Sequence, residues 1–569
     1  MTIGIKLSNN MKWWMAIALF TIHCSLFVSP LGAQPSWVKK ATKSVFALKT
    51  FGSDGSLLAS SMGFYVGTGG EAVGPFAPFK GAQRAVVIDA FGKEMAVECM
   101  LGASETYDVA KFRVAGAKTQ PLAIAGGRQT AGAEVWLLPY RETKRVPQGT
   151  IRKAETFNDR YDYYTVALQM PENAVGAPLL TADGQVVGVM QQPASSTDTL
   201  NYAVSALFAD SLAINGLSMN DRSLRQTGIK KALPADESQA LLSLYMGVSS
   251  LDSASYATLV DGFIAQFPMS HEGYLYKAQL EANAHRYAEA DRQVNQAMKV
   301  TQKADEVHYS YSRLVYQKAL THPEIDYEPW TLDLSLEEAR KAYECNAQPI
   351  YMQQQAYVLY AQQRYADASA IYDQLFTTPL RSPELFYEAS RCKQMERDTV
   401  GQLALLDSCV AQFSRPYLKD AAPYLLARSQ VQAGRGQYRA AVADLNDYEQ
   451  LMAAQVGAQF YYLRFQYEVG GRLFQQALND INKAITMEPQ NEGFFAEKAS
   501  LEVRVGLYDD AIASAQEVIR IAPDNSDGYL FLGVAQCLKG QKAEGVKNLE
   551  KADEMGDPQA AALIEKYSK

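Results

Sequence analysis

Residues 171–190 read PENAVGAPLLTADGQVVGVM and carry the signals of a tight β-hairpin. Asp183-Gly184 is a favoured two-residue hairpin turn, and apolar residues lie on both sides of it. The stretch GAPLL at 176–180 stands directly before this hairpin, and Val175 precedes it. These features predict β-structure around residue 180, and the neighbouring sequence extends that prediction in both directions.

Short runs rich in β-branched and aromatic residues recur through the first third of the chain, and Gly, Asp or Pro punctuate most of the gaps. They lie at 44–51, 63–68, 84–90, 95–101, 109–114, 135–140, 163–170 and 185–190. Many short strands at this spacing indicate a β-barrel or sandwich. We therefore predict a β-domain over 34–217, followed by a polar, turn-rich linker at 218–238.

After residue 238 the hydrophobic period becomes helical and repeats. Small residues recur at Ala290, Ala368, Ala441, Ala477, Ala511 and Gly545. An aromatic residue stands three positions before each of the first five, at Tyr287, Tyr365, Tyr438, Phe474 and Tyr508. The last three small residues are 34 positions apart, which is the tetratricopeptide (TPR) period. An all-α solenoid of helix pairs is predicted over 239–569, with weaker units at 240–268, 305–345 and 382–415.

Four motifs in the β-domain resemble those of trypsin-like serine peptidases of the HtrA type, in the same order. SMGFYVGTGGEAV at 61–73 resembles a core strand and turn, and GPFAPFKGA at 74–82 falls where that family has its histidine motif. ETYDVAKFRV at 105–114 resembles the strand of the triad aspartate, and NYAVSA at 201–206 resembles a strand lining the substrate groove. The resemblance covers roughly 37–216 and implies a double β-barrel.

The same resemblance locates the positions of the Ser-His-Asp triad. The aspartate is present as Asp108, but Ala77 stands at the histidine position and Val175 at the serine position. Asn173 and Ala174 also depart from the family's oxyanion turn. Histidine occurs in the chain only at 23, 271, 285, 308 and 322, so the β-domain contains no histidine to act as the base. Because triad catalysis needs both the nucleophile and its base, we expect a pseudo-protease without catalytic residues.

Three interpretations remain for the β-domain. A serine–lysine pair could replace the triad, with Lys80 or Lys111 as base and Ser61 or Ser104 near them in sequence. Alternatively, a protease-like cleft could bind a peptide as an added strand without cleaving it, and the residues expected to do so are Asn201, Tyr202 and Ala203. A purely structural role as a cap for the solenoid is the third interpretation.

In the solenoid, the first helix of each pair is expected to face a groove. Counting from the repeat template, the residues predicted to bind a partner are Tyr462, Gln466, Val469, Leu530 and Val534. No lysine or arginine occupies the groove positions of the last three repeats. The sequence therefore disfavours a carboxylate clamp and predicts a partner segment with apolar or aromatic anchors.

The N-terminus has the pattern of a secretory signal peptide over residues 1–33. Lys12 precedes an apolar run from Trp13 to Val28, and small residues follow up to Ala33. We expect export, with a periplasmic location and peripheral association with membrane complexes or the outer membrane. An uncleaved anchor is the alternative, although the apolar run is short.

Charge and cysteine content exclude other classes. The formal net charge is +4 over 34–235 and −14 over 236–569, and such an acidic half disfavours nucleic acid as a partner. The five cysteines after residue 33 form no C-x-x-C pair and have no nearby histidine, so neither a metal site nor a cofactor is expected. A Cys392–Cys409 disulfide is the single pairing that the spacing suggests.

The sequence as a whole predicts an exported, non-catalytic interaction scaffold that binds envelope proteins or peptide segments through its TPR groove. Two other functions remain open. One is a working serine peptidase with displaced catalytic residues, and the other is a folding or assembly factor for envelope proteins.

Overall fold

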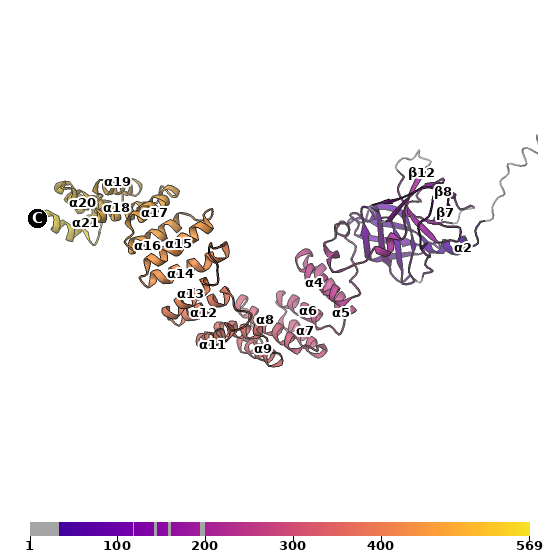
Figure 1. Cartoon of the computed structure of the whole chain (residues 1–569), viewed down its shortest axis with the longest axis horizontal. Helices are drawn as coiled ribbons and strands as arrows, with labels where there is room; N and C mark the ends of the chain where they lie inside the picture. The colour runs from indigo at the N-terminus through magenta and orange to yellow at the C-terminus, as the bar shows by residue number, and fades with distance from the viewer. Residues whose placement is uncertain (1–33, 118, 142–144, 158–160, 194–199) are drawn as a thin grey trace, which may run out of the picture. The chain divides into compact units, whose positions relative to one another are not determined.

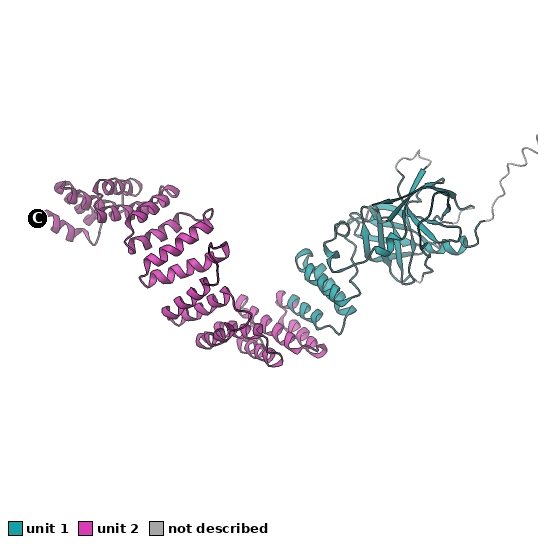
Figure 2. Cartoon of the chain, viewed as in Figure 1, with its two compact units in different colours: residues 1–280 teal, residues 281–569 magenta. Residues whose placement is uncertain are grey.

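The structure is a computed structural model that describes residues 34–117, 119–141, 145–157, 161–193 and 200–569. The predicted signal peptide lies outside these residues. The chain divides into two compact units, 1–280 and 281–569 (Figure 2). Strands occupy the N-terminal part of the first unit, and helices make up the remainder of the chain (Figure 1).

Twelve described strands form two closed antiparallel barrels in the first unit. The first barrel has the order β1-β2-β3-β6-β5-β4, with strands β1 (Val45–Phe51), β2 (Leu57–Tyr65), β3 (Glu71–Gly74), β4 (Arg84–Ile88), β5 (Glu94–Ser104) and β6 (Val109–Val114). The second has the order β10-β11-β12-β9-β8-β7, with β7 (Glu134–Leu137), β8 (Gln148–Phe157), β9 (Tyr161–Ala167), β10 (Pro178–Leu180), β11 (Val186–Met190) and β12 (Leu200–Ser205). This confirms the trypsin-like double-barrel fold.

Each barrel encloses its own apolar core, and a third cluster joins the two. Phe46, Phe79 and Phe112 fill the first barrel, and Leu137 and Leu179 belong to the core of the second. The joining cluster takes residues from both barrels, among them Val45, Phe64, Val109, Leu180 and Val204. Closing both sheets leaves few exposed strand edges, and the shared cluster fixes how the barrels pack.

The segment predicted as a linker, 218–238, is bound along the first barrel. Its short 3-10 helices η3 (Gly216–Asn220) and η4 (Leu224–Gln226) lead into a parallel bridge between Met100 and Lys231. Leu224 and Ile229 are buried in the core of the first barrel. The segment is therefore part of the folded barrel region, although its sequence is polar.

Helices follow in antiparallel pairs, as predicted. The first unit contains α2 (Val38–Ala41), α3 (Phe208–Ser211), α4 (Glu237–Ser250) and α5 (Ser253–Gln266), and α6 (His271–Asn283) spans the division between the units. The second unit continues with α7 (Tyr287–Val300), α8 (Ala304–Thr321), α9 (Leu332–Cys345), α10 (Pro349–Ala361), α11 (Tyr365–Leu375), α12 (Pro383–Met395), α13 (Thr399–Val410), α14 (Ala422–Gly434) and α15 (Tyr438–Met452). Its last helices are α16 (Ala458–Gly470), α17 (Phe474–Met487), α18 (Glu492–Val505), α19 (Tyr508–Ile521), α20 (Ser526–Lys539), α21 (Lys542–Glu554) and α22 (Ala560–Ser568).

The repeat template is confirmed residue by residue. The template aromatic is the first residue of α7, α11, α15, α17 and α19, and the small residue of each repeat is buried near the start of its helix. Two positions before each of these second helices, including α13 and α21, stands a left-handed residue, at His285, Gln363, Arg397, Gly436, Arg472, Gly506 and Gly540. The same backbone turn therefore closes seven helix pairs.

Two sequence expectations about the helical part can be checked further. Cys392 and Cys409 are both buried and free, so the suggested disulfide is not formed. Burial raises the pKa of both thiols, which keeps them in the unreactive protonated form. Among the described residues, no helix combines the length and apolarity needed to cross a membrane.

Candidate functional site

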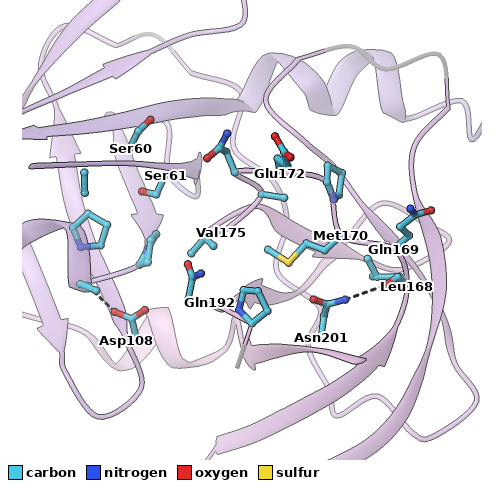
Figure 3. A pocket seen from close by; sticks show the side chains of 18 residues that line it. Ser60, Ser61, Asp108, Leu168, Gln169, Met170, Glu172, Val175, Gln192 and Asn201 are labelled. Atoms are coloured by element: carbon cyan, nitrogen blue, oxygen red, sulfur yellow. Dashed lines mark hydrogen bonds between the residues drawn. The ribbon is translucent and has the colours of Figure 1, made fainter. Parts of the chain in front are cut away.

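A cleft of about 930 Å³ lies where the two barrels meet (Figure 3). The first barrel contributes the middle of β2 and the residues around Ala77 and Asp108. The second contributes the segment from Leu168 to Val175 and, beyond it, Gln192, Pro193 and Asn201. The three positions that the resemblance assigned to a triad thus line one cavity, as a protease-like arrangement requires.

Asp108 holds the backbone on the first-barrel side of the cleft. Its Oδ1 atom accepts a hydrogen bond of 2.6 Å from the N–H of Ala77, the first residue of η2 (Ala77–Phe79). Burial raises the pKa of Asp108, although the N–H groups of Ala77 and Phe76 oppose the shift. The carboxylate is therefore fixed next to the side chain of residue 77, which here is a methyl group.

Val175 lies on the opposite side of the cleft, at the end of a tight turn. Its carbonyl accepts a hydrogen bond of 2.7 Å from the N–H of Met62 in β2, which ties the two barrels together. Gly176 follows with φ of 85°, and a Cβ there would lie 2.1 Å from the Met62 carbonyl oxygen. The backbone of this turn thus requires glycine at 176.

The turn residue Asn173 adopts a left-handed conformation with φ of 60°. Asparagine tolerates this conformation better than most residues, because its short side chain can bond locally. Among the described residues, neither the N–H of Asn173 nor that of Val175 donates to a protein acceptor. Two backbone donors therefore remain available beside the cleft.

The residues considered as a substitute catalytic pair do not come together. Lys80 pairs with Glu105 at 2.7 Å, and Lys111 donates to the carbonyl of Ala209 at 3.2 Å. Ser61 lines the cleft with 5% exposure and an unpartnered hydroxyl, but neither lysine lines it. The geometry gives no support to a serine–lysine base arrangement.

The strand predicted to bind a peptide, Asn201 to Ala203, is bonded on both sides at Tyr202 and Ala203. β12 pairs with β9 from Leu200 to Val204 and with β11 from Ala203 to Ser205, and the Tyr202 carbonyl accepts from Gln191. Asn201 is 4% exposed and donates its side-chain amide to the Leu168 carbonyl at 2.9 Å. The expectation of an available edge at Tyr202 and Ala203 was therefore wrong, because barrel closure uses both sides of this strand.

The free edge beside the cleft belongs to β2 instead, which the sequence did not reveal. From Leu57 to Ser61 this strand pairs with β1, whereas its pairing with β3 is confined to Phe64 and Tyr65. Met62 directs its N–H toward Val175, so Ser60, two residues earlier, directs its backbone groups to the same side. Ser60 also lines the cleft.

The predicted solenoid residues have mixed surroundings. Gln466 is exposed and Tyr462, Val469 and Val534 are half-buried, so all four have surface that a partner could contact. Leu530 is only 3% exposed and packs in the core formed by α20, α21 and α22. The groove assignment of Leu530 was therefore wrong, because helix packing at the end of the array covers its side chain.

Comparisons with known proteins give short or partial matches. No protein-family model matches it. Small glutamine-rich tetratricopeptide repeat-containing protein 2 of Saccharomyces cerevisiae is 30% identical over 95 residues, or 16% of this chain and 28% of that protein. The Hsp70-Hsp90 organizing protein of Triticum aestivum is 28% identical over 78 residues, or 14% of this chain and 13% of that protein. The matches thus span less than a third of the length of these relatives.

Solved structures resemble the barrel region. The active form of the Rv3671c protease from M. tuberculosis has a TM-score of 0.29 and 19% identity, with 32% of this chain and 85% of that chain covered. An inactive form of the same protease has a TM-score of 0.27 and 19% identity, with 32% and 94% covered. By strand order and helix repeat, the chain combines a trypsin-like double β-barrel with a tetratricopeptide array.

Proposed function

We propose that this chain is a non-catalytic protein-interaction scaffold whose protease-like cleft has lost its chemistry. The observation that supports the proposal is the lining of the cleft, where Val175 and Ala77 stand at the positions that the sequence resemblance assigns to the nucleophile and the base. The sequence contains no histidine from residue 34 to residue 270. Asp108 alone cannot supply a nucleophile and a base, so hydrolysis by a triad has no route.

The helical array supplies the main binding surface in this proposal. Stacked helix pairs present a long surface made of many repeats, which suits extended protein segments. One of the matched relatives is named as an organizing protein for two other proteins. We extend only the general property, binding of proteins, to this chain.

The cleft has a secondary binding role in the proposal. An extended peptide could pair with the free edge of β2 between Leu57 and Ser61, because this mode uses backbone groups and needs no nucleophile. The unbonded N–H groups of Asn173 and Val175 would lie beside such a peptide as further donors.

The proposed location is the periplasm, with envelope proteins as partners and peripheral association with membrane complexes. It rests on the signal-like pattern of residues 1–33 alone. N-terminal sequencing of the chain recovered from a periplasmic fraction should begin near residue 34. A chain that retains Met1 or Met11 and stays in the cytoplasm would contradict this part.

The absence of catalysis is tested with a fluorophosphonate probe and a casein substrate, with trypsin as the positive control. The full chain should show no labelling and no cleavage above a buffer blank. Labelling that persists after protease-free purification and maps by mass spectrometry to 34–216 would contradict the proposal.

The binding role is tested by photo-crosslinking in an envelope extract with point variants of the full chain. Tyr462→Ala combined with Val534→Ala should reduce capture of the main partner by about tenfold, since aromatic and apolar anchors carry most interface energy. Ser60→Pro removes the N–H that faces the cleft, and Ser60→Ala retains it as the matched control. If neither the Tyr462→Ala, Val534→Ala double variant nor Ser60→Pro reduces capture, the scaffold assignment fails.

A further inference from the structure

A cluster of tyrosine and arginine side chains extends across three consecutive first helices of the array. We call it the tyrosine face, and it consists of Tyr309, Arg313 and Tyr316 on α8, Tyr357 and Tyr360 on α10, and Arg391 on α12. On α8 the three positions are i, i+4 and i+7, so they share one side of the helix. None of these residues belonged to the groove predicted from the sequence, which was placed on α16 and α20.

Contacts between neighbouring helices join this face into one surface. The guanidinium of Arg391 lies 4.9 Å from the ring centroid of Tyr360 and donates to its hydroxyl at 3.4 Å. The ring centroid of Tyr309 on α8 lies 5.1 Å from that of Tyr351 on α10. Residues from α8, α10 and α12 are therefore close enough to act on one ligand.

The tyrosines are half-buried, so their rings are held by packing while part of each remains accessible. Tyr316 and Tyr360 pack against the apolar core of this region of the array. Rigid tyrosines that expose a ring face and a hydroxyl provide contact area at a low cost in conformational entropy. This is the residue composition in which binding energy concentrates at protein interfaces.

Several hydrogen-bond donors of the tyrosine face have no partner within the described part of the chain. Among the described residues, the hydroxyls of Tyr309 and Tyr316 have no hydrogen-bond partner. Arg313 is exposed, lies over the Tyr309 ring at 5.6 Å and forms no ion pair within the described part of the chain. A ligand rich in acceptors, with one carboxylate placed for Arg313, would complement this arrangement.

The neighbouring charges strengthen the argument for a mostly uncharged ligand. Helix α10, Pro349–Ala361, contains no Asp, Glu, Lys or Arg. On α12, Glu388 is already paired with Arg391 at 3.3 Å. Arg313 is therefore the one described cation of the face without a carboxylate partner, and a single acidic residue would satisfy it.

We propose that the tyrosine face binds an extended, proline-rich peptide segment that carries one acidic residue. A polyproline II segment exposes its carbonyl oxygens as acceptors and has few N–H donors, and aromatic grooves receive its rings. Packed helices are about 8–10 Å apart, so the three helices span about 20 Å. At about 3.1 Å per residue, six or seven residues of such a segment reach across the face.

This inference rests on the proposed function, because it names the class of partner for the same array. Its test uses a purified full chain and a fluorescent peptide of about seven residues, proline throughout except for a central glutamate. Anisotropy titration should give saturable binding. A peptide with glutamine at the centre should bind about three- to tenfold more weakly, since it lacks the charge for Arg313.

Three variants locate the binding. Tyr357→Ala should weaken binding of both peptides by about tenfold, because it removes a ring from the middle of the face. Arg313→Gln should weaken binding of the glutamate peptide and leave the glutamine peptide unchanged. Arg340→Gln, an exposed arginine on the adjacent helix α9, is the matched control and should change neither titration. Circular dichroism melting of each variant checks that the array stays folded.

Several outcomes would overturn the inference. They are no saturation up to the solubility limit of the peptide, equal losses in the Arg313 and Arg340 variants, or binding of a neutral oligosaccharide in preference to the peptide. If the peptide fails but crosslinked partners still depend on Tyr462 and Val534, the scaffold function stands and only this assignment falls.

Discussion

The Oδ1 atom of Asp108 lies 2.6 Å from the backbone nitrogen of Ala77 and accepts its hydrogen. This bond connects the residue before β6 to the first turn of η2, and it is made from a left-handed backbone with φ of 47° at Asp108. The aspartate therefore has a structural role that does not depend on catalysis.

Asp108→Ala should therefore destabilise the barrel unit by about 1–3 kcal/mol, since it leaves the Ala77 N–H without its acceptor and places alanine at a positive φ. Asp108→Asn keeps an acceptor and tolerates this φ, so it should lose less. Thermal unfolding followed by the β-sheet signal measures both. Equal losses in the two variants would mean that the bond contributes little.

Ala77→His would place an imidazole beside the Asp108 carboxylate. Its pKa should rise above the ordinary value of about 6.5, because a neighbouring negative charge favours the imidazolium form. Titration of the new histidine by NMR measures this shift, and Ala77→His with Asp108→Asn serves as the control. The same pKa with and without the carboxylate would show that the side chains at 77 and 108 do not face each other.

Gly176 and Gly506 have nearly the same φ but different surroundings. Comparing their alanine variants therefore separates the stability cost of a steric clash from that of a left-handed alanine. Gly176 has φ of 85° and a Cβ there would lie 2.1 Å from a carbonyl oxygen, whereas Gly506 has φ of 83° and open space around it. Gly506→Ala should cost about 1–2 kcal/mol, the price of a left-handed alanine. Gly176→Ala should cost several times more in thermal unfolding, and similar losses would indicate that the inter-barrel turn can relax.

Glu468 should make the stability of the array depend on pH. Burial and the nearby Asp480 carboxylate raise the pKa of Glu468 to about 8, against the opposing charge of Arg464. Its unfolded pKa is near 4.5, so the folded state holds a proton that the unfolded state releases between about pH 4.5 and 8. Stability from this group is complete below about pH 4.5 and is lost as the pH rises through 8.

The variant Glu468→Gln mimics the protonated form and should flatten this decline, so that its melting temperature exceeds that of the native chain by a growing margin as the pH rises. Glu550→Gln, at an exposed position on α21, is the control. A margin that does not change between pH 5 and 8 would show that Glu468 titrates normally in the fold.

The fold was largely predictable because the regularly spaced β-rich runs and the helical repeat period are both strong in the sequence. The predicted strand at 109–114 agrees with the structure to the residue, and the structure places each template aromatic at the first residue of a second helix. The strand β8, Gln148–Phe157, was missed because polar and charged residues alternate with few apolar ones, and Ile151 is its one fully buried apolar side chain among those described. β3 and β10 are too short to show a period.

The candidate site was only partly predictable. Motif order located Ala77, Asp108 and Val175, because the strands next to them in the sequence have recognisable patterns. Strand edges are set by pairing partners far apart in the sequence, so neither the closure of β12 on both sides nor the open edge of β2 could be inferred. The tyrosine face could not be predicted for a similar reason, since its residues on neighbouring helices of the face are more than 30 positions apart in the sequence.

The way in which residues 218–238 are bound to the first barrel limits how the protein can be divided. A fragment that ends at residue 217 would lack Leu224 and Ile229, which fill part of the barrel core, and Met219 and Leu233, which pack against α4 and α5. A barrel released by truncation there would expose apolar surface and aggregate. Gene fusions and domain exchanges should therefore place their junction after α5, so that the barrel keeps residues 218–238, which complete its core.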